Sequence, residues 1–341
     1  MKRKISAAAA ILSIAALTAC SSQASNANGS DGSNENYNWD MSITTSETSA
    51  WWAGAEKFTE ILDEESDGRL AVTVFANETL SSGDTSAGIE QLMEGTKALS
   101  YTSAIQYYSF DDRFSAIAAP FLFANYEEVD AVLADPEVQQ AYSDLLEEMG
   151  IKFLGFAENG FRHFSSNVVE IREPDDLSGQ KLRVPGSPLS LDIFNSFGSD
   201  PVVMSFNELF TSLQTGTVDG HENSIDLIQS GGLDEVTKYL TISNYVFDPL
   251  ILSMNLDLYN SLSAEDQQII NEAAEAANEY EIEFIREREA EQLKEIEQNI
   301  TVTRLTEDEL AAFREFVQPI YDSWDSKWTS ELAAHVQPET D

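Results

Sequence analysis

The chain has 341 residues, of which 42% are hydrophobic, so it is long enough for about two domains and apolar enough to bury real cores. It carries 60 acidic residues against 19 basic ones, a formal net charge of −41. Nucleic acid is therefore excluded as a partner, because phosphate binding needs clustered Lys and Arg, and any anion site must be a small local exception. The charge favours solubility, for which a saline medium is one explanation.

The first 20 residues are typical of a targeting segment rather than of the fold. Basic residues at 2–4 precede an apolar stretch at 7–17, which is too short to span a bilayer as a mature helix. Cys20 is the only cysteine, so neither a disulfide framework nor a cysteine metal site is expected. The run Leu17-Thr18-Ala19-Cys20 resembles a bacterial lipobox, which implies cleavage and lipidation at Cys20. The alternative is an ordinary signal peptide followed by an idle cysteine.

Residues 21–37 are mostly Ser, Asn and Gly, which predicts a flexible tether. A lipid at Cys20 and this tether would hold the folded part outside the cytoplasm, close to a membrane that it does not enter. We therefore expect an extracytoplasmic monomer that is attached to the membrane by its N-terminal lipid alone.

Strands and helices alternate from about Trp39 onward. Strands are expected at 41–44, 70–75 and 98–103, and helices from the N-cap Ser49 to about Ser66, at 88–93, and at 127–149 with a break at Asp135-Pro136. This βαβ alternation predicts a parallel sheet with helices on its faces. The apolar run Pro120-Phe121-Leu122-Phe123 is more typical of a core than of a site.

A second alternating run follows, with its own strands and turns, and predicts a second domain. Its expected elements are a strand at 151–156, a turn at 174–179, a strand at 180–185, a helix at 189–197, a strand at 201–205, a helix at 208–214 that Gly216 ends, and a strand end that passes into a loop at 217–223. The apolar strand 247–254 could return to the first sheet.

A long helix is expected at 263–299, capped by Ser263 and free of Pro and Gly. At 1.5 Å per residue it would extend about 55 Å, which favours a bridge across two domains over a coiled coil. A strand at 301–303 and a last helix at 307–328 complete the chain.

The expected fold is α/β, with two domains joined by a hinge. Residues 38–157 and 247–262 form the predicted domain I, 158–246 domain II, 263–299 the bridging helix, and 300–341 a strand and helix that pack back on both.

Signatures of catalysis are absent: the sequence has no cysteine nucleophile, GxGxxG, P-loop or HExxH motif. The histidines at 163, 221 and 335 lie far apart, and His221-Glu222 has no second histidine at helical spacing, so a metal site is not expected. Carboxylate pairs such as Asp111-Asp112 mean little in so acidic a chain. No cofactor and no enzymatic activity are predicted.

Polar side chains stand out at predicted strand ends, where open α/β sheets bind ligands. Arg162, Arg183 and Asn223 each lie in or just after a strand of the second run. Taken alone, each is an ordinary structural or solvated residue. If they converge, the two guanidinium groups would form a cationic spot suited to a small carboxylate, held by paired N–H donors away from water.

The sequence around these residues resembles the solute-binding proteins of TRAP transporters (tripartite ATP-independent periplasmic transporters, the DctP-like family). The likeness extends from about Trp39 to Trp328 and is strongest in the runs Asn159-Gly160-Phe161-Arg162, 174–185 (PDDLSGQKLRVP) and 206–223 (FNELFTSLQTGTVDGHEN). It implies a fold like that of periplasmic binding proteins and membrane subunits of the transporter as partners.

The resemblance also implies roles for single residues. Arg183 matches the arginine that forms the main salt bridge to the ligand carboxylate, and Arg162 matches one that assists. Asn223 matches an asparagine that hydrogen-bonds the same carboxylate, and Phe206 an aromatic side chain that packs on the ligand.

From the first domain, Ser103 and Glu47 are the candidate ligand contacts. Two positions depart from the family pattern: Ser224 replaces a frequent proline, and Tyr245 a frequent histidine. Both departures make the ligand harder to identify, but neither changes the expected role of Arg183.

The sequence thus predicts a lipid-anchored protein that captures a small organic acid, a C4-dicarboxylate or a sugar acid, by domain closure and passes it to a membrane permease. A subunit that reports a ligand to a sensor kinase is one alternative, and a lipid-anchored hydrolase is another.

Overall fold

A computed structural model describes residues 35–328 and Leu332. The predicted signal segment with Cys20, most of the predicted tether, and His335 lie outside the described residues. The first strand begins at Tyr37, so the tether was predicted to extend too far.

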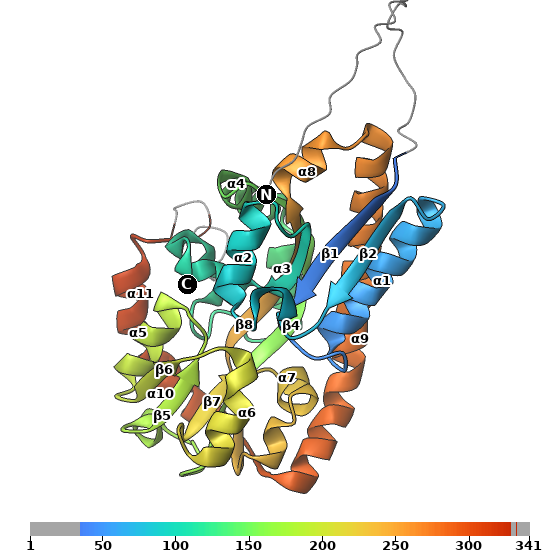
Figure 1. Cartoon of the computed structure of the whole chain (residues 1–341). Coiled ribbons are helices and arrows are strands. Elements are labelled where there is room, and N and C mark those ends of the chain that lie inside the picture. The colour runs from blue at the N-terminus through green and yellow to red at the C-terminus, as the bar shows by residue number, and fades with distance from the viewer. Residues whose placement is uncertain (1–34, 329–331, 333–341) are drawn as a thin grey trace, which may run out of the picture. The chain divides into compact units, whose positions relative to one another are not determined.

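The described helices and strands alternate as expected for an α/β fold (Figure 1). The strands are β1 (Tyr37–Ile43), β2 (Leu70–Phe75), β3 (Leu99–Ser103), β4 (Ile151–Ser166), β5 (Lys181–Val184), β6 (Asp200–Val203), β7 (Gly220–Asn223), β8 (Tyr239–Asn255) and β9 (Thr301–Arg304). The α-helices are α1 (Ala50–Glu65), α2 (Thr85–Met93), α3 (Tyr126–Leu133), α4 (Pro136–Glu148), α5 (Pro188–Ser196), α6 (Phe206–Thr215), α7 (Ile225–Ser230), α8 (Leu256–Ser261), α9 (Ala264–Asn299), α10 (Glu307–Phe316) and α11 (Gln318–Trp324).

Local sequence signals explain most helix boundaries. Ser49 caps α1 by accepting a hydrogen bond from the amide of Trp52, and Ser263 caps α9 in the same way. The break predicted at Asp135 separates α3 from α4, where Pro136 takes the first helical position. Gly216 ends α6 with φ of 71°, a left-handed conformation that glycine adopts at low cost.

The predicted last helix, 307–328, was wrong as a single element. Pro319 lies in the first turn of α11 and has no N–H to bond the turn before it, so the chain breaks at Val317, between Phe316 and Gln318. The short helix α7 was also missed, because 217–223 was expected to pass into a loop.

The nine described strands form one mixed sheet in the order β2-β1-β3-β8-β4-β7-β5-β6, with β9 beside β8. The predicted parallel pairing holds for β1 with β2 and β3, and for β5 with β6 and β7. The pairs that join these two groups, β3 with β8, β8 with β4 and β4 with β7, are antiparallel.

Two long strands, β4 and β8, connect the first group of strands to the second. Their pairing shifts register between Glu158 and Gly160, beside Pro249 of β8. A proline inside a central strand lacks its ladder donor, and such an irregularity accommodates it. The predicted domain limits at 157/158 and 246/247 fall inside these strands, and they remain a prediction.

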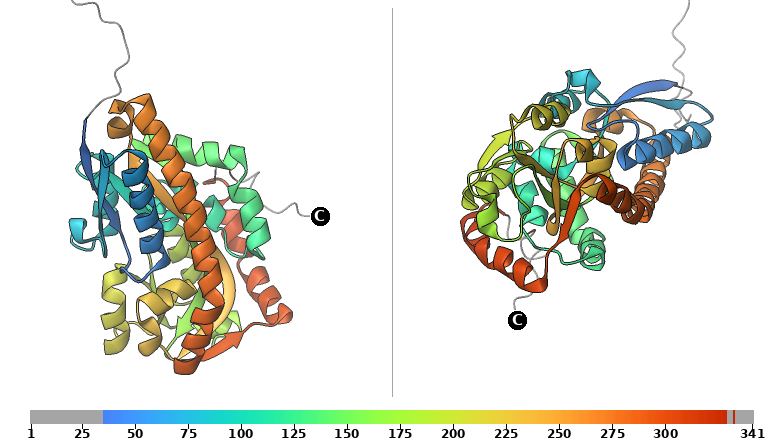
Figure 2. Two further views of the ribbon diagram at one scale, coloured as in Figure 1. Left: turned by 90° about the vertical axis from the view of Figure 1, so that its right-hand side faces the viewer. Right: turned by 90° about the horizontal axis from the view of Figure 1, so that it is seen from below.

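Helix α9 is the long C-terminal helix that the sequence predicts (Figure 2). It packs side by side with α1 and contacts β4 near the register shift, then reaches α7 and β9. Together, α1 and α9 pack on β1, β3 and β8 and form with them an apolar cluster that includes Trp51 of α1, Met41 of β1 and Leu252 of β8. Within the described ranges, no helix combines the length and the apolar character needed to cross a membrane.

Candidate functional site

Arg183 lies on β5 at the edge where the parallel strands end, and only 3% of it is exposed. Its Nε donates to the carbonyl of Met204 at 3.1 Å. Among the described residues, its terminal nitrogens have no hydrogen bond, and no carboxylate lies within ion-pair distance. Burial lowers the pKa of Arg183 to about 10, which still leaves the guanidinium charged at neutral pH. An unpaired buried charge of this kind is costly unless an anion completes it.

Arg162, on β4, is equally buried but surrounded by acceptors. Its Nε and Nη2 donate to the carboxylate of Glu222, and Nη2 also donates to the Glu222 carbonyl at 3.0 Å. Its Nη1 donates to Asp248 at 2.9 Å. Burial alone would lower the pKa of Arg162, but the charge of Glu222 and then that of Asp248 outweigh it and raise the pKa. Of the five N–H groups of an arginine, these bonds leave one, on Nη1.

The acceptors around Arg162 are themselves held in place. The Tyr245 hydroxyl donates to Glu222 at 2.6 Å. Asp248 accepts from Ser103 at 2.6 Å and from Asn159 at 2.7 Å. This buried network, which we call the Arg162 network, ties β3, β4, β7 and β8 together behind the site.

Arg162 and Arg183 meet at a small inner cavity of about 20 Å³, room for a water molecule. Its lining residues come from both groups of strands and from the helices beside them: Thr44, Thr45, Trp51, Ser103, Ile105, Gln106, Arg162, Arg183, Pro185, Phe206, Asn223 and Leu227. Five of the six ligand contacts expected from the sequence are therefore brought together. The exception is Glu47, which lies in a turn before α1, is exposed and lines neither this cavity nor the outer one.

Residues that line the inner cavity have polar hydrogens without acceptors among the described residues. Asn223 uses its side-chain oxygen to accept from the amide of Ser224, and its Nδ2 has no partner among the described residues. Trp51 Nε1 is also buried without a partner there. Together with the terminal nitrogens of Arg183, the unused groups are donors, which is the pattern of an anion site.

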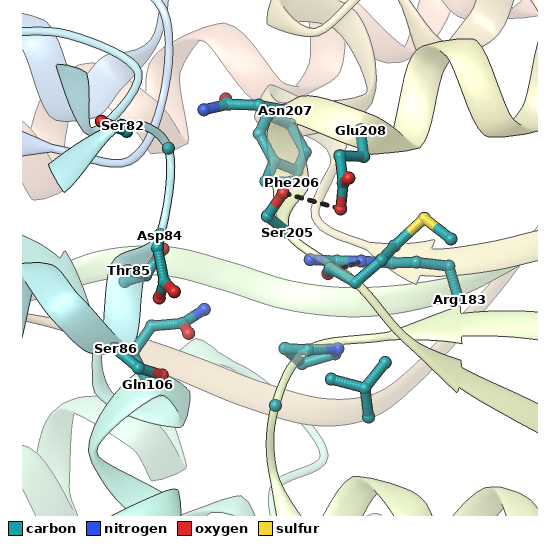
Figure 3. A pocket seen from close by; sticks show the side chains of 15 residues that line it. Ser82, Asp84, Thr85, Ser86, Gln106, Arg183, Ser205, Phe206, Asn207 and Glu208 are labelled. Carbon is teal, nitrogen blue, oxygen red and sulfur yellow. Dashed lines mark hydrogen bonds between the residues drawn. The ribbon is translucent and has the colours of Figure 1, made fainter.

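A larger outer cavity of about 470 Å³ continues from Arg183 toward solvent (Figure 3). Its wall on one side carries Arg183, Phe206, Asn207 and Glu208, and on the other Gln106 and the start of α2 at Asp84. Among the described residues that line this cavity, Arg183 is the only basic one. Asn207 Nδ2 donates to the carbonyl of Asn77 at 2.8 Å and so connects α6 with the loop after β2.

Sequence reasoning missed Trp51, Gln106 and Thr45 as lining residues. Trp51 lies at helical spacing from Ala55, Phe58 and Leu62, which predicts a place on the apolar face of its helix, where it also packs. A tryptophan in the first turn of a helix that follows a strand end is the signal that could have pointed to it.

The buried histidines carry no metal site. Burial lowers the pKa of His163 and of His221 to about 3, so both imidazoles are neutral at physiological pH. His163 Nδ1 accepts from the amides of Ser243 and Asn244. Across 35–328 and at 332, no group of three or more potential ligand side chains is placed to hold a metal ion.

Comparisons with known proteins agree with this architecture. The sugar acid binding protein DctPAm of Advenella mimigardefordensis, solved with galactonate, superposes with a TM-score of 0.84 at 31% identity, over 89% of this chain and 97% of that one. The 2,3-diketo-L-gulonate-binding periplasmic protein YiaO of Escherichia coli is 30% identical over 71% of this chain and 73% of its own. The C4-dicarboxylate-binding protein DctB of Bacillus subtilis is 29% identical over 82% of this chain and 79% of its own.

The model of one family matches residues 41–327, nearly all of the described chain. Its members bind solutes for transporters and are not enzymes. The chain therefore belongs to the bacterial extracellular solute-binding proteins of family 7, the DctP family.

Proposed function

We propose that this protein is the extracytoplasmic binding subunit of a TRAP transporter and captures a small organic acid through Arg183. The observation that carries the proposal is a buried arginine without a carboxylate partner among the described residues, at the junction of two cavities. A ligand carboxylate would accept paired N–H bonds from its guanidinium, which a lysine could not reproduce.

Other lining residues complete the carboxylate site. Asn223 donates its free Nδ2 hydrogens, and the one N–H left on Arg162 Nη1 assists. Phe206 lines both cavities and packs on the ligand where it passes from the inner to the outer one. Closure of the first group of strands over the second buries the ion pair, and β4 and β8 bend at their register shift to allow it.

A sugar acid suits the cavities better than a C4-dicarboxylate. A second carboxylate would need a second cation, but of the described residues that line the outer cavity only Arg183 is basic, and Asp84 and Glu208 are acidic. Serine hydroxyls and side-chain amides in the same lining suit a hydroxylated chain. Similar proteins are described with galactonate and with 2,3-diketo-L-gulonate, although the B. subtilis relative is described as binding C4-dicarboxylates.

Delivery follows from the same proposal. The loaded protein hands its ligand to the membrane subunits of the transporter, and a lipid on Cys20 keeps a monomer close to them. Incorporation of labelled lipid into the wild type, and its loss in Cys20→Ser, would test the anchor.

The ligand site is tested by a thermal-shift screen of organic acids followed by calorimetry, since a ligand that binds only the folded state raises its stability. We expect Arg183→Ala to keep the fold and to weaken binding at least ~100-fold, or about 2.7 kcal/mol. Arg172→Ala, at an exposed arginine, serves as the matched control. Wild-type affinity in Arg183→Ala would overturn the anchor, and turnover of a bound acid would overturn the binding role.

A further inference from the structure

Trp51 has two environments. Its ring belongs to the apolar cluster between α1 and the sheet, and only 2% of the residue is exposed. The residue also lines the inner cavity, and its Nε1 is buried without an acceptor among the described residues. A buried indole N–H usually finds a partner, and leaving it unsatisfied costs about 1–3 kcal/mol. The described residues thus lack an acceptor for Trp51, and the inner cavity beside it is where a ligand could supply one.

Trp51 approaches from a different side than the other free donors. It lies in the first turn of α1, whereas Arg183 and Asn223 lie on β5 and β7 of the second group of strands. The first turn of α1 contains no acidic residue of its own, and the carboxylate that accepts from its Ala50 amide at 3.0 Å belongs to Asp226 of α7. An acceptor bound by Trp51 therefore bridges the two groups of strands.

A carboxylate alone does not satisfy all of these donors. Its two oxygens offer about four acceptor positions: the guanidinium fork of Arg183 takes two, and Asn223 and the remaining N–H of Arg162 take the other two. The next acceptor along an organic acid is an oxygen on C2. We propose that Trp51 donates its Nε1–H to that oxygen, so that the protein selects acids with a hydroxyl or carbonyl group at C2. This inference rests on the proposed carboxylate site at Arg183.

Selection at C2 follows from the cost of an unmet donor. An acid with a methylene group at C2 would leave the indole N–H buried and unpaired in the closed complex. The loss of one such hydrogen bond reduces affinity about tenfold, at 1.4 kcal/mol per decade. The remainder of the acid extends past Phe206 into the outer cavity.

The test compares matched acids in matched variants by calorimetry. The probes are D-gluconate with 2-deoxy-D-gluconate, and lactate with propanoate. The variants of the intact protein are Trp51→Phe, which keeps an aromatic ring without the N–H, and Trp52→Phe, which changes the half-buried neighbour on the same helix. Melting temperatures confirm that each variant is folded.

We expect the wild type and Trp52→Phe to prefer the 2-hydroxy acid of a pair about tenfold, and Trp51→Phe to bind both acids of the pair within about twofold. A preference that survives in Trp51→Phe, equal weakening of both acids, or no preference in the wild type would each overturn the role of Trp51. In those cases, organic-acid binding by the wild type that is lost in Arg183→Ala would still support the proposed function. Failure of every acid to bind the wild type would overturn the proposed function together with this inference.

Discussion

Arg162 and Arg183 are buried to the same degree, 4% and 3% exposed, yet their surroundings differ completely. The Arg162 network supplies two carboxylates and a carbonyl, whereas Arg183 bonds to one backbone carbonyl. The first guanidinium joins neighbouring strands, and the second keeps terminal donors without a partner among the described residues. Unused donors, and not burial alone, are the reason for proposing Arg183 as the main ligand anchor.

The largest effect is expected from breaking the Arg162 network. Glu222→Ala removes the acceptor that engages two nitrogens of Arg162 and the Tyr245 hydroxyl. It should lower the free energy of unfolding by about 3–5 kcal/mol, because it leaves a buried charge partly unpaired. Urea denaturation measures this. Glu60→Ala, which breaks an exposed pair with Lys57, should change the free energy by less than about 1 kcal/mol and is the control.

The difference between the two arginines can be removed by giving Arg183 a carboxylate partner within the protein. Asn223→Asp places an acidic group in the inner cavity that Arg183 lines. We expect the new aspartate to occupy the ligand's place and to weaken binding of organic acids at least ~100-fold, or about 2.7 kcal/mol, without loss of stability. Calorimetry and thermal melting check both parts. Asn223→Ala, which removes one donor, should weaken binding only about tenfold; equal affinity in Asp and wild type would contradict the shared site.

Lysine substitutions should separate the two roles. Arg162→Lys keeps the charge but loses the fork that bonds Glu222 and Asp248, so unfolding should become about 2 kcal/mol easier. Arg183→Lys should leave stability unchanged and weaken binding about tenfold. Each variant needs a denaturation curve and a ligand titration. If Arg162→Lys weakened binding alone and Arg183→Lys lowered stability alone, the two roles would have to be exchanged.

The effect that is smallest near neutral pH concerns the protonation of His221. Burial and the nearby charges of Arg183 and Arg162 lower the pKa of His221 to about 3, below its ordinary value of 6.5. The unfolded chain binds a proton below pH 6.5 that the folded chain refuses until about pH 3, so stability falls as pH drops through this window. In His221→Gln this slope should decrease by about 1.4 kcal/mol per pH unit, with no change near pH 8. Denaturation across the range measures it, and an unchanged slope would contradict the buried neutral imidazole.

Local sequence signals were sufficient for elements whose ends depend on adjacent residues. Ser49, Asp135-Pro136 and Ser263 mark boundaries of helices by capping and by the missing proline N–H, and the structure has those boundaries. The full lengths of β4 and β8 were not predictable in this way. Their apolar runs are interrupted by polar residues such as Arg162 and Asp248, which are buried only because tertiary contacts satisfy them.

The sequence also allowed part of the candidate site to be predicted. Parallel strand ends meet at one edge, so Arg183 and Asn223 could be expected to converge. Which donors stay unused depends on the packing of distant segments. Asp248 and Glu222 accept the hydrogen bonds of Arg162, whereas no described residue accepts from Trp51 Nε1. Helical spacing predicts that Trp51 belongs to the core, and periodicity cannot show that a core residue also lines a cavity.

The continuity of β4 and β8 has a consequence for dissecting the protein. A fragment cut at the predicted domain limits would begin partway along β4 and end partway along β8, with its backbone ladder severed at both cuts. It would also lose Asp248, which accepts from Arg162, and α9, which packs on α7. The half that carries Arg183 is therefore not a transplantable module: an engineered sensor should insert its reporter in surface loops of the intact chain and leave these two strands whole.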